Sequence, residues 1–320
     1  MTTQAGTASP WRAPLGAWLQ EHAASLSLDA ERVEMRELVN PSGWHENVAC
    51  LVLGGASRLH VKLTRHGDGL RQTYRLRERL ASRYRMPPIL AWIELDGFVG
   101  IVKPSVPAKL GGHGVIPALL PVINRLHGDR ELLDALSTPA KTMREAFADL
   151  WIERLTEDLD ELQAEDRMPP FVTREMAGWM REETVRLEAM TRTASFDLPA
   201  DSPVHQDLHL GNVLVEPDGT WWLIDWDDLS RGDPAADMAT LLAPLLERGK
   251  RPEELLGERP ASFMERFALS SRAVVLDIIV DSLADWADAG QSPESANSVR
   301  RDKRAAHESA LRAYGIRYTD

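Results

Sequence analysis

The densest group of chemically active side chains lies in residues 205–212, with the sequence HQDLHLGN, and Asp225 follows thirteen residues after Asn212. Phosphoryl transfer needs a carboxylate near an attacking hydroxyl. It also needs separate oxygen ligands that hold magnesium across the phosphates. Asp207, Asn212 and Asp225 together provide such a set, so their types and spacing favour phosphoryl transfer.

The residues around this group predict a short hairpin followed by a helix. Residues 213–215 and 221–224 are strand-like and flank a Pro-Asp-Gly turn, which predicts two antiparallel strands. Asp233 and Pro234 form a good helix start, because an acceptor at the N-cap is followed by proline in the first turn. The chemistry is therefore expected at the ends of the hairpin.

Residues 205–212 resemble the His-x-Asp-x-x-x-x-Asn loop of the aminoglycoside phosphotransferase and choline kinase family, relatives of protein kinases that act on small molecules. Residues 232–239 resemble the family's continuation into a helix. The resemblance implies that Asp207 accepts the hydroxyl proton and that Asn212 and Asp225 bind Mg²⁺.

Two further residues of this stretch receive supporting roles from the same resemblance. His205 is expected to brace the loop rather than perform chemistry, and Asp237 is expected to steady it. Leu126 and His127 resemble a Leu-His pair in the family's second lobe, which we interpret as structural.

The resemblance implies that the upstream half binds ATP. Lys62 ends an apolar strand-like run, where a cation can reach the α and β phosphates. Glu78, on the following helix, is expected to pair with Lys62, although neighbouring arginines offer it other partners. Ser42 and Gly43 are expected to let the backbone approach the phosphates, and the backbone around residues 101–103 is expected to contact adenine.

The order of elements agrees with an α+β, bilobal protein-kinase-like fold. Strand-like segments and one basic helix dominate residues 1–104, after a leading helix, and this part is the expected nucleotide-binding lobe. Residues 105–320 are mainly helical and form the expected catalytic and substrate-binding lobe.

Composition excludes several other classes. The chain has 320 residues and a formal net charge of −12, which disfavours a protein that grips nucleic acid. No apolar run approaches the length of a membrane span, and the first ten residues lack the layout of a secretory signal. Cys50 is the single cysteine, so no intrachain disulfide forms, and a reducing cytoplasm fits best.

Two rival functions remain open. His205, Asp207 and His209 alternate and could ligate a metal, as in a metallohydrolase, but this leaves Asn212 and Lys62 without a role. The second rival is a non-catalytic kinase-like binding protein. Such proteins usually lack a key residue, whereas this chain has Lys62, Asp207, Asn212 and Asp225.

The acceptor is the least determined part of the function. Asp227 and Asp228 follow the expected metal ligand and could face a cationic acceptor, or they could be surface charge. With the net acidity and the resemblance, they favour an aminoglycoside or another amine-bearing antibiotic, whose phosphorylation would give resistance. Homoserine, choline, a sugar and a nucleoside antibiotic are the alternatives.

Overall fold

A computed structural model describes residues 9–38, 47–164, 167–289 and 293–313. These residues divide into two compact units. The first contains the chain up to Lys109 together with the later segment Val213–Asp227, and the second contains Leu110–Asn212 and the chain from Asp228 onward. The predicted nucleotide-binding lobe, residues 1–104, does not include this later segment. Ser42 and Gly43 lie outside the described residues.

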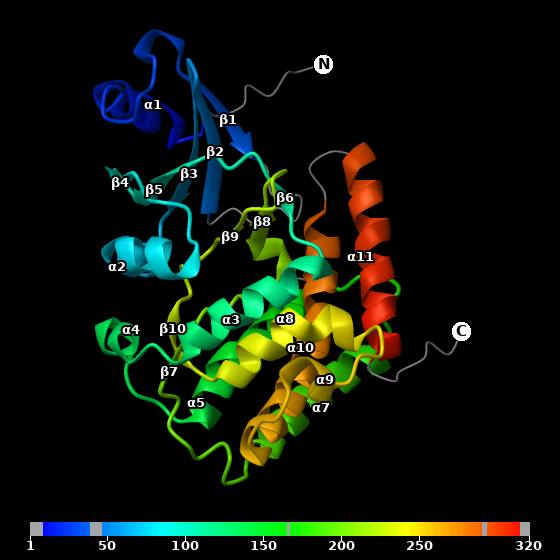
Figure 1. Cartoon of the computed structure of the whole chain (residues 1–320). Coiled ribbons are helices and arrows are strands. Elements are labelled where there is room, and N and C mark those ends of the chain that lie inside the picture. Colours follow the sequence, from blue (N-terminus) through cyan, green and yellow to red (C-terminus); the bar gives the residue numbers. More distant parts are fainter. Residues whose placement is uncertain (1–8, 39–46, 165–166, 290–292, 314–320) are drawn as a thin grey trace. The chain divides into compact units, whose positions relative to one another are not determined.

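The first unit is built on a five-stranded antiparallel sheet with the strand order β1-β2-β3-β5-β4 (Figure 1). Its elements are α1 (Arg12–Glu21), η1 (Ala30–Arg32), β1 (Glu34–Leu38), β2 (Asn47–Gly54), β3 (Ser57–Thr64), α2 (Asp68–Tyr84), β4 (Ala91–Leu95) and β5 (Phe98–Pro104). The later segment adds the hairpin of β8 (Val213–Val215) and β9 (Trp221–Leu223), beside which lies β6 (Lys109–Leu110).

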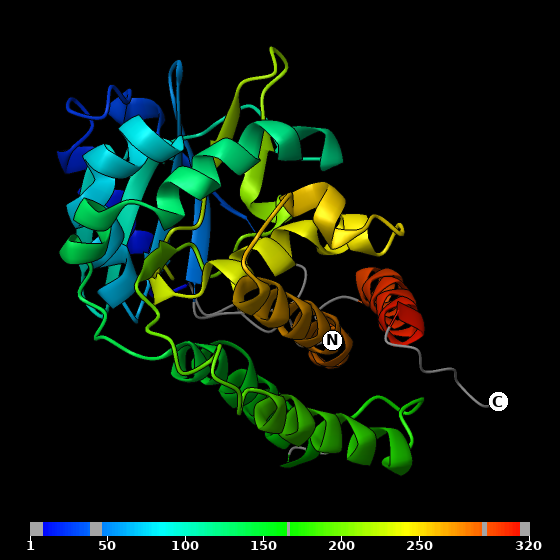
Figure 2. The same ribbon diagram turned by 60° about the horizontal axis from the view of Figure 1, so that its bottom comes forward.

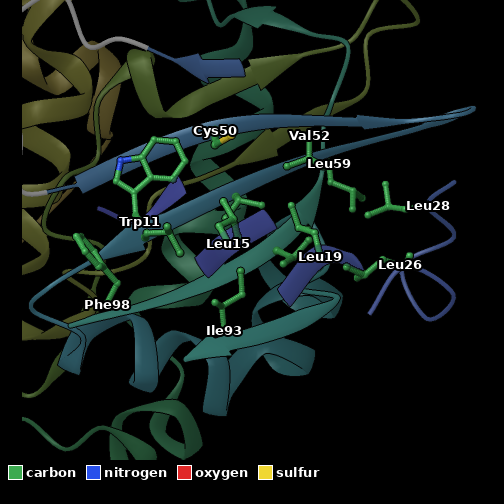
Figure 3. Packing of buried hydrophobic residues seen from close by; sticks show 14 residues of the cluster. Trp11, Leu15, Leu19, Leu26, Leu28, Cys50, Val52, Leu59, Ile93 and Phe98 are labelled. Atoms are coloured by element: carbon green, nitrogen blue, oxygen red, sulfur yellow. The ribbon is translucent and has the colours of Figure 1, made fainter. Parts of the chain in front are cut away.

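One face of this sheet packs against the leading helix. Trp11, Leu15 and Leu19 of the α1 region are fully or almost fully buried against apolar side chains of the strands (Figure 3). On β3 the core side chains are Leu59, Val61 and Leu63. Successive side chains of a strand point to opposite faces, so the residues between them lie on the other face of the sheet.

The second unit is mainly helical. Its helices are η2 (His113–Val115), α3 (Ile116–His127), α4 (Arg130–Ala135), α5 (Met143–Phe147), the π-helical turn η3 (Ala148–Ile152), α6 (Glu153–Ala164), α7 (Arg174–Met190), η4 (Leu210–Asn212), α8 (Pro234–Leu246), α9 (Pro252–Leu256), α10 (Ala261–Asp288) and α11 (Pro293–Ala313). Two short strands, β7 (Ser202–Val204) and β10 (Ser230–Gly232), pair antiparallel. The long helix α10 packs against α6, α8 and α11 (Figures 1 and 2).

The start of α8 confirms the helix signal of the sequence. Asp233 is the N-cap, its Oδ1 accepts a hydrogen bond from the backbone N–H of Ala235, and Pro234 occupies the first position. The other carboxylate oxygen of Asp233 accepts from Nε of Arg266 at 2.8 Å, and both side chains are 6% exposed. This buried ion pair fixes the beginning of α8 to α10.

Among the described residues, no helix combines the length and apolar character that crossing a membrane requires.

Candidate active site

The loop between β7 and η4 holds the first group of candidate residues, all in the second unit. Nδ2 of Asn212 donates to the backbone oxygen of Asp207 at 2.9 Å and to Oδ2 of the same residue at 2.6 Å. Gln206, just before Asp207, has φ of 72°, a left-handed conformation that non-glycine residues rarely adopt. Such backbone strain persists where surrounding bonds impose it, and it is common at functional sites.

His209 acts on Asp207 from within the same loop. The N–H of Gly211 donates to Nδ1 of His209 at 3.0 Å, so the neutral ring carries its hydrogen on Nε2. Nε2 lies 3.4 Å from Oδ1 of Asp207. Burial alone would raise the pKa of Asp207, but His209 and Asn212 outweigh it and lower that pKa to about 2. Asp207 is therefore ionised at neutral pH, as an acceptor of a hydroxyl proton must be.

Asp237 holds this loop from α8. Its two carboxylate oxygens accept from the backbone N–H groups of His205 and Gln206, each at 2.9 Å. Nε2 of His127, at the end of α3, lies 2.9 Å from Oδ2 of Asp237, whose side chain is 1% exposed. One buried carboxylate thus fixes the strained backbone that precedes Asp207.

A cavity of about 340 Å³ in the second unit reaches this loop. Its lining is Leu150, Trp151, Arg154, Gln206, Asp207, His209, Thr240, Ala243, Pro244, Glu247, Val274, Asp277, Ile278 and Asp281. Burial and the neighbouring Asp281 raise the pKa of Asp277 to about 7, against the opposing effect of Arg154, whose Nε lies 3.4 Å from Oδ1 of Asp277. Burial and Asp285 also raise the pKa of Asp281. The cavity therefore contains more carboxyl groups than cations.

The second group of candidate residues lies in the first unit, on the sheet face opposite α1. Nζ of Lys62 on β3 lies 2.5 Å from Oδ1 of Asp225 and also pairs with Asp227. Burial would lower the pKa of Lys62, but the two carboxylates outweigh burial and raise it. Lys62 is therefore a firmly charged cation on the sheet face opposite α1, although its side chain is only 13% exposed.

The segment that carries Asp225 and Asp227 is held to α2. The hydroxyl of Thr73 donates to the backbone oxygen of Trp226 at 2.9 Å, and the Trp226 ring packs on Tyr84 with 5.9 Å between ring centroids. A Cβ on Gly69 would lie 2.1 Å from the backbone oxygen of Asp227, so only glycine permits this approach. Helix α2 thus positions the carboxylates that pair with Lys62.

The sequence model of the phosphotransferase enzyme family (APH) matches residues 38–261, more than half of the chain. The chain belongs to this family. The prediction of a small-molecule kinase is therefore confirmed. No curated protein matches this phosphotransferase significantly in sequence.

Solved structures of low sequence identity share the fold of this phosphotransferase. The spectinomycin phosphotransferase APH(9)-Ia, in complex with ADP and spectinomycin, has a TM-score of 0.56 at 14% identity and covers 92% of this chain and 97% of that one. Plasmodium vivax ethanolamine kinase has a TM-score of 0.58 at 12% identity, with 97% and 89% covered. A protein from Haemophilus somnus described as a fructosamine-3-kinase has a TM-score of 0.56 at 12% identity, and the match covers 92% of this chain and 98% of that one. The predicted α+β, protein-kinase-like fold is confirmed.

The expected pair of Lys62 and Glu78 is not formed, and this expectation is corrected. The Glu78 side chain on α2 is 90% exposed and lies 3.8 Å from Arg77. Lys62 instead pairs with Asp225 and Asp227. The physical reason is the tight approach of the segment after β9 to α2, which places two carboxylates beside the ammonium group.

The structure separates the two aspartates that were considered together as substrate residues. The carboxylate of Asp227 is occupied by Lys62. Asp228 belongs to the second unit, where it lines a hollow of about 330 Å³ together with Asp149, Arg154 and Asp207. Asp227 and Asp228 therefore lie in different environments although they are adjacent in the sequence.

The two residues expected to bind a metal offer oxygen atoms, one in each unit. In the second unit Nδ2 of Asn212 is committed to Asp207, which leaves its amide oxygen, and in the first unit Asp225 carries a carboxylate that pairs with Lys62. Oxygen donors of this kind suit Mg²⁺. In the described part of the chain, no three His, Cys, Asp or Glu side chains are grouped to hold a metal, so the metallohydrolase alternative finds no support there.

Sequence reasoning missed the residues that shape the cavity. Asp277 and Asp281 lie on α10 and Arg154 on α6, in segments that read only as amphipathic helix. The available signal was weak: two aspartates four residues apart lie on one face of a helix otherwise rich in apolar residues.

Proposed function

We propose that this chain is an ATP-dependent O-phosphotransferase that uses Mg²⁺ and phosphorylates a hydroxyl group of an amine-bearing small molecule. The observation that carries the proposal is an ionised Asp207 at the wall of an acidic cavity. A hydroxyl acceptor in this cavity would meet the base at its reacting end and carboxyl groups at its other end.

The proposed site residues have distinct parts in this reaction. Asp207 orients the acceptor hydroxyl and takes its proton, and its low pKa keeps it ready at neutral pH. Lys62 neutralises phosphate oxygens of ATP. Asn212 and Asp225 would hold Mg²⁺, which would supply neutralisation of the phosphate charge.

The preference for an amine follows from the charge of the cavity. Glu247, Asp277 and Asp281 face one cation, Arg154, in the same wall. A protonated amine on the acceptor would replace the missing positive charge and would draw Asp277 to its ionised form. Ethanolamine and fructosamine, for which two of the similar structures are named, are amines.

Among amine-bearing acceptors we propose an antibiotic such as an aminoglycoside, whose phosphorylation would give resistance. Support comes from the family match and from the similar fold of a spectinomycin phosphotransferase. A primary metabolite such as homoserine or choline, a sugar, or a nucleoside antibiotic is the second candidate. The non-catalytic alternative is disfavoured because the described loop holds its base in an ordered hydrogen-bond network.

The test is consumption of ATP with Mg²⁺ against a panel of aminoglycosides, spectinomycin, ethanolamine, homoserine, choline, sugars and nucleoside antibiotics. We expect an amine-bearing acceptor to be phosphorylated, and Asp207→Asn to lower turnover by a factor of about 10² to 10⁴ while ATP still binds. Asp134→Asn, at an exposed position on α4, is the matched control. Turnover by Asp207→Asn at the level of this control would refute the assignment.

A further inference from the structure

The first unit contains a cavity of about 540 Å³ that has no part in the proposed reaction. It lies at one end of the sheet face that packs against α1, where β2 begins, β3 ends and β5 begins: Asn47 pairs with Thr64, and Thr64 pairs with Val99. Lys62 alternates with the core residues of β3 and therefore points to the opposite face. The cavity is thus separate from the group around Lys62, and its volume is typical of sites for small molecules.

The floor of this cavity is apolar and aromatic. Trp11, 3% exposed, and Phe98, 8% exposed, both line the cavity and lie together at one end of the buried cluster of this unit (Figure 3). Val48 of β2 also lines it and lies on the same face, because it pairs with the core residue Leu63. The floor can therefore cover an apolar chain or ring of a ligand.

Arg65, which follows β3, places a guanidinium group in the lining of the cavity. Its Cζ lies 5.2 Å from the centre of the Phe98 ring, a cation–π contact that holds the group over the floor. Among the described residues, none accepts a hydrogen bond from the Arg65 side chain or forms an ion pair with it. A planar guanidinium group in such a position can bind a carboxylate through two parallel hydrogen bonds.

Glu37 of β1 adds a carboxylate to the same lining. It lies directly opposite the buried core residue Cys50 in the antiparallel register, so its side chain is on the α1 face of the sheet. In the part of the chain that the structure describes, the exposed Glu37 side chain has no hydrogen bond or ion pair. The lining therefore offers one guanidinium group and one carboxylate beside an apolar floor.

We propose that this cavity binds a free α-amino acid with an apolar side chain. Arg65 holds the carboxylate of the amino acid, Glu37 holds its ammonium group, and the floor covers its side chain. A simple organic anion would leave Glu37 without a partner and would be repelled by it. A peptide end carries only one of the two charged groups, so the pair of Arg65 and Glu37 favours a free amino acid.

The experiment titrates L-phenylalanine, 3-phenylpropionate and 2-phenylethylamine into the full chain and follows its backbone amide signals by NMR. The second compound lacks the ammonium group of L-phenylalanine, and the third lacks its carboxylate. We expect L-phenylalanine to bind and to shift the signals of Trp11 and Arg65. Each of the other two compounds should bind about tenfold more weakly, because each loses one charge-assisted contact.

Two variants assign the charged groups of the ligand to side chains of the cavity. Arg65→Met should raise the Kd for L-phenylalanine and 3-phenylpropionate by about tenfold and change that for 2-phenylethylamine by less than about threefold. Glu37→Gln should weaken L-phenylalanine and 2-phenylethylamine but not 3-phenylpropionate. Arg65→Lys keeps the charge without the planar donors, so its affinity should fall between those of the wild type and Arg65→Met. Arg58→Met, at an exposed position of β3 on the other sheet face, is the matched control and should leave all three values unchanged.

Three outcomes would overturn the proposal: no binding of L-phenylalanine up to about 10 mM, signal shifts confined to residues outside the cavity, or equal weakening of all three compounds in both variants. The last would indicate a general disturbance of the cavity instead of recognition of two charges. Thermal unfolding of Arg65→Met at the wild-type midpoint would show that its lost binding is not a loss of fold. None of these outcomes bears on Asp207 or on the phosphoryl transfer proposed above.

Discussion

Asp277 gives a quantitative test of the acidic cavity, because its carboxyl group is only 16% exposed and has a pKa raised to about 7. Burial and Asp281 raise this pKa more than Arg154 lowers it. We consider the change Asp277→Asn, which keeps the shape of the side chain and removes the ionisable group.

The expected size of the effect follows from the pKa difference between the folded and unfolded states. In the unfolded chain the pKa is near the ordinary value of 3.8, so between that value and about 7 the folded protein holds a proton that the unfolded chain has released. Unfolding free energy therefore falls as pH rises through this window. Between about pH 5 and about pH 8 the loss attributable to Asp277 is about 3 kcal/mol.

Urea denaturation of the wild type and of Asp277→Asn at the two pH values measures this loss. The variant lacks the ionisable group, so its stability advantage over the wild type should grow between the lower and the higher pH by roughly the loss just derived. Asp134→Asn, on the surface of α4, should show no such pH-dependent gain. An equal pH dependence in wild type and Asp277→Asn would refute the raised pKa and with it the charge argument for the cavity.

Three further predictions concern the two groups of site residues. Lys62→Met removes the cation between Asp225 and Asp227. Because these carboxylates are partly exposed, we expect the unfolding free energy measured in urea to fall by about 2 kcal/mol. The control Lys109→Met, at an exposed position of the same unit, should leave the unfolding free energy unchanged. Asp237→Asn replaces one of two acceptor oxygens under the catalytic loop, so kcat should fall by about tenfold while the Kd for ATP stays constant in calorimetry; a normal kcat would contradict the anchoring role. The KM of an amine acceptor should fall as pH rises through about 7, when Asp277 ionises, whereas a neutral acceptor should show no such trend in steady-state kinetics.

The loop of residues 205–212 could be singled out from the sequence because its polar side chains lie close together along the chain. Asp207 and Asn212 are five residues apart and interact directly within one turn of chain. The N-cap at Asp233 was predictable for the same reason, since a cap depends on the residues beside it. The strands of the first unit and the helices that follow it were visible in their periodicity of apolar residues.

The partner of Lys62 was not predictable from local pattern. Position on a helix favoured Glu78, but the close approach at Gly69 brings Asp225 and Asp227 to the lysine across a gap of more than 160 residues in the sequence. Charge alone could not discriminate between these carboxylates, because the choice depends on which backbone segment α2 accepts.

The sequence by itself therefore determined the reaction class, because Asp207 and Asn212 lie in one loop with a recognisable spacing. Only the tertiary structure decided which groups surround that loop, namely the buried anchor Asp237 and the cavity carboxyls of α10, and which carboxylates of the first unit pair with Lys62. The physical reason is that burial and charge at a site depend on side chains from distant elements, whereas a motif records only its own neighbours along the chain.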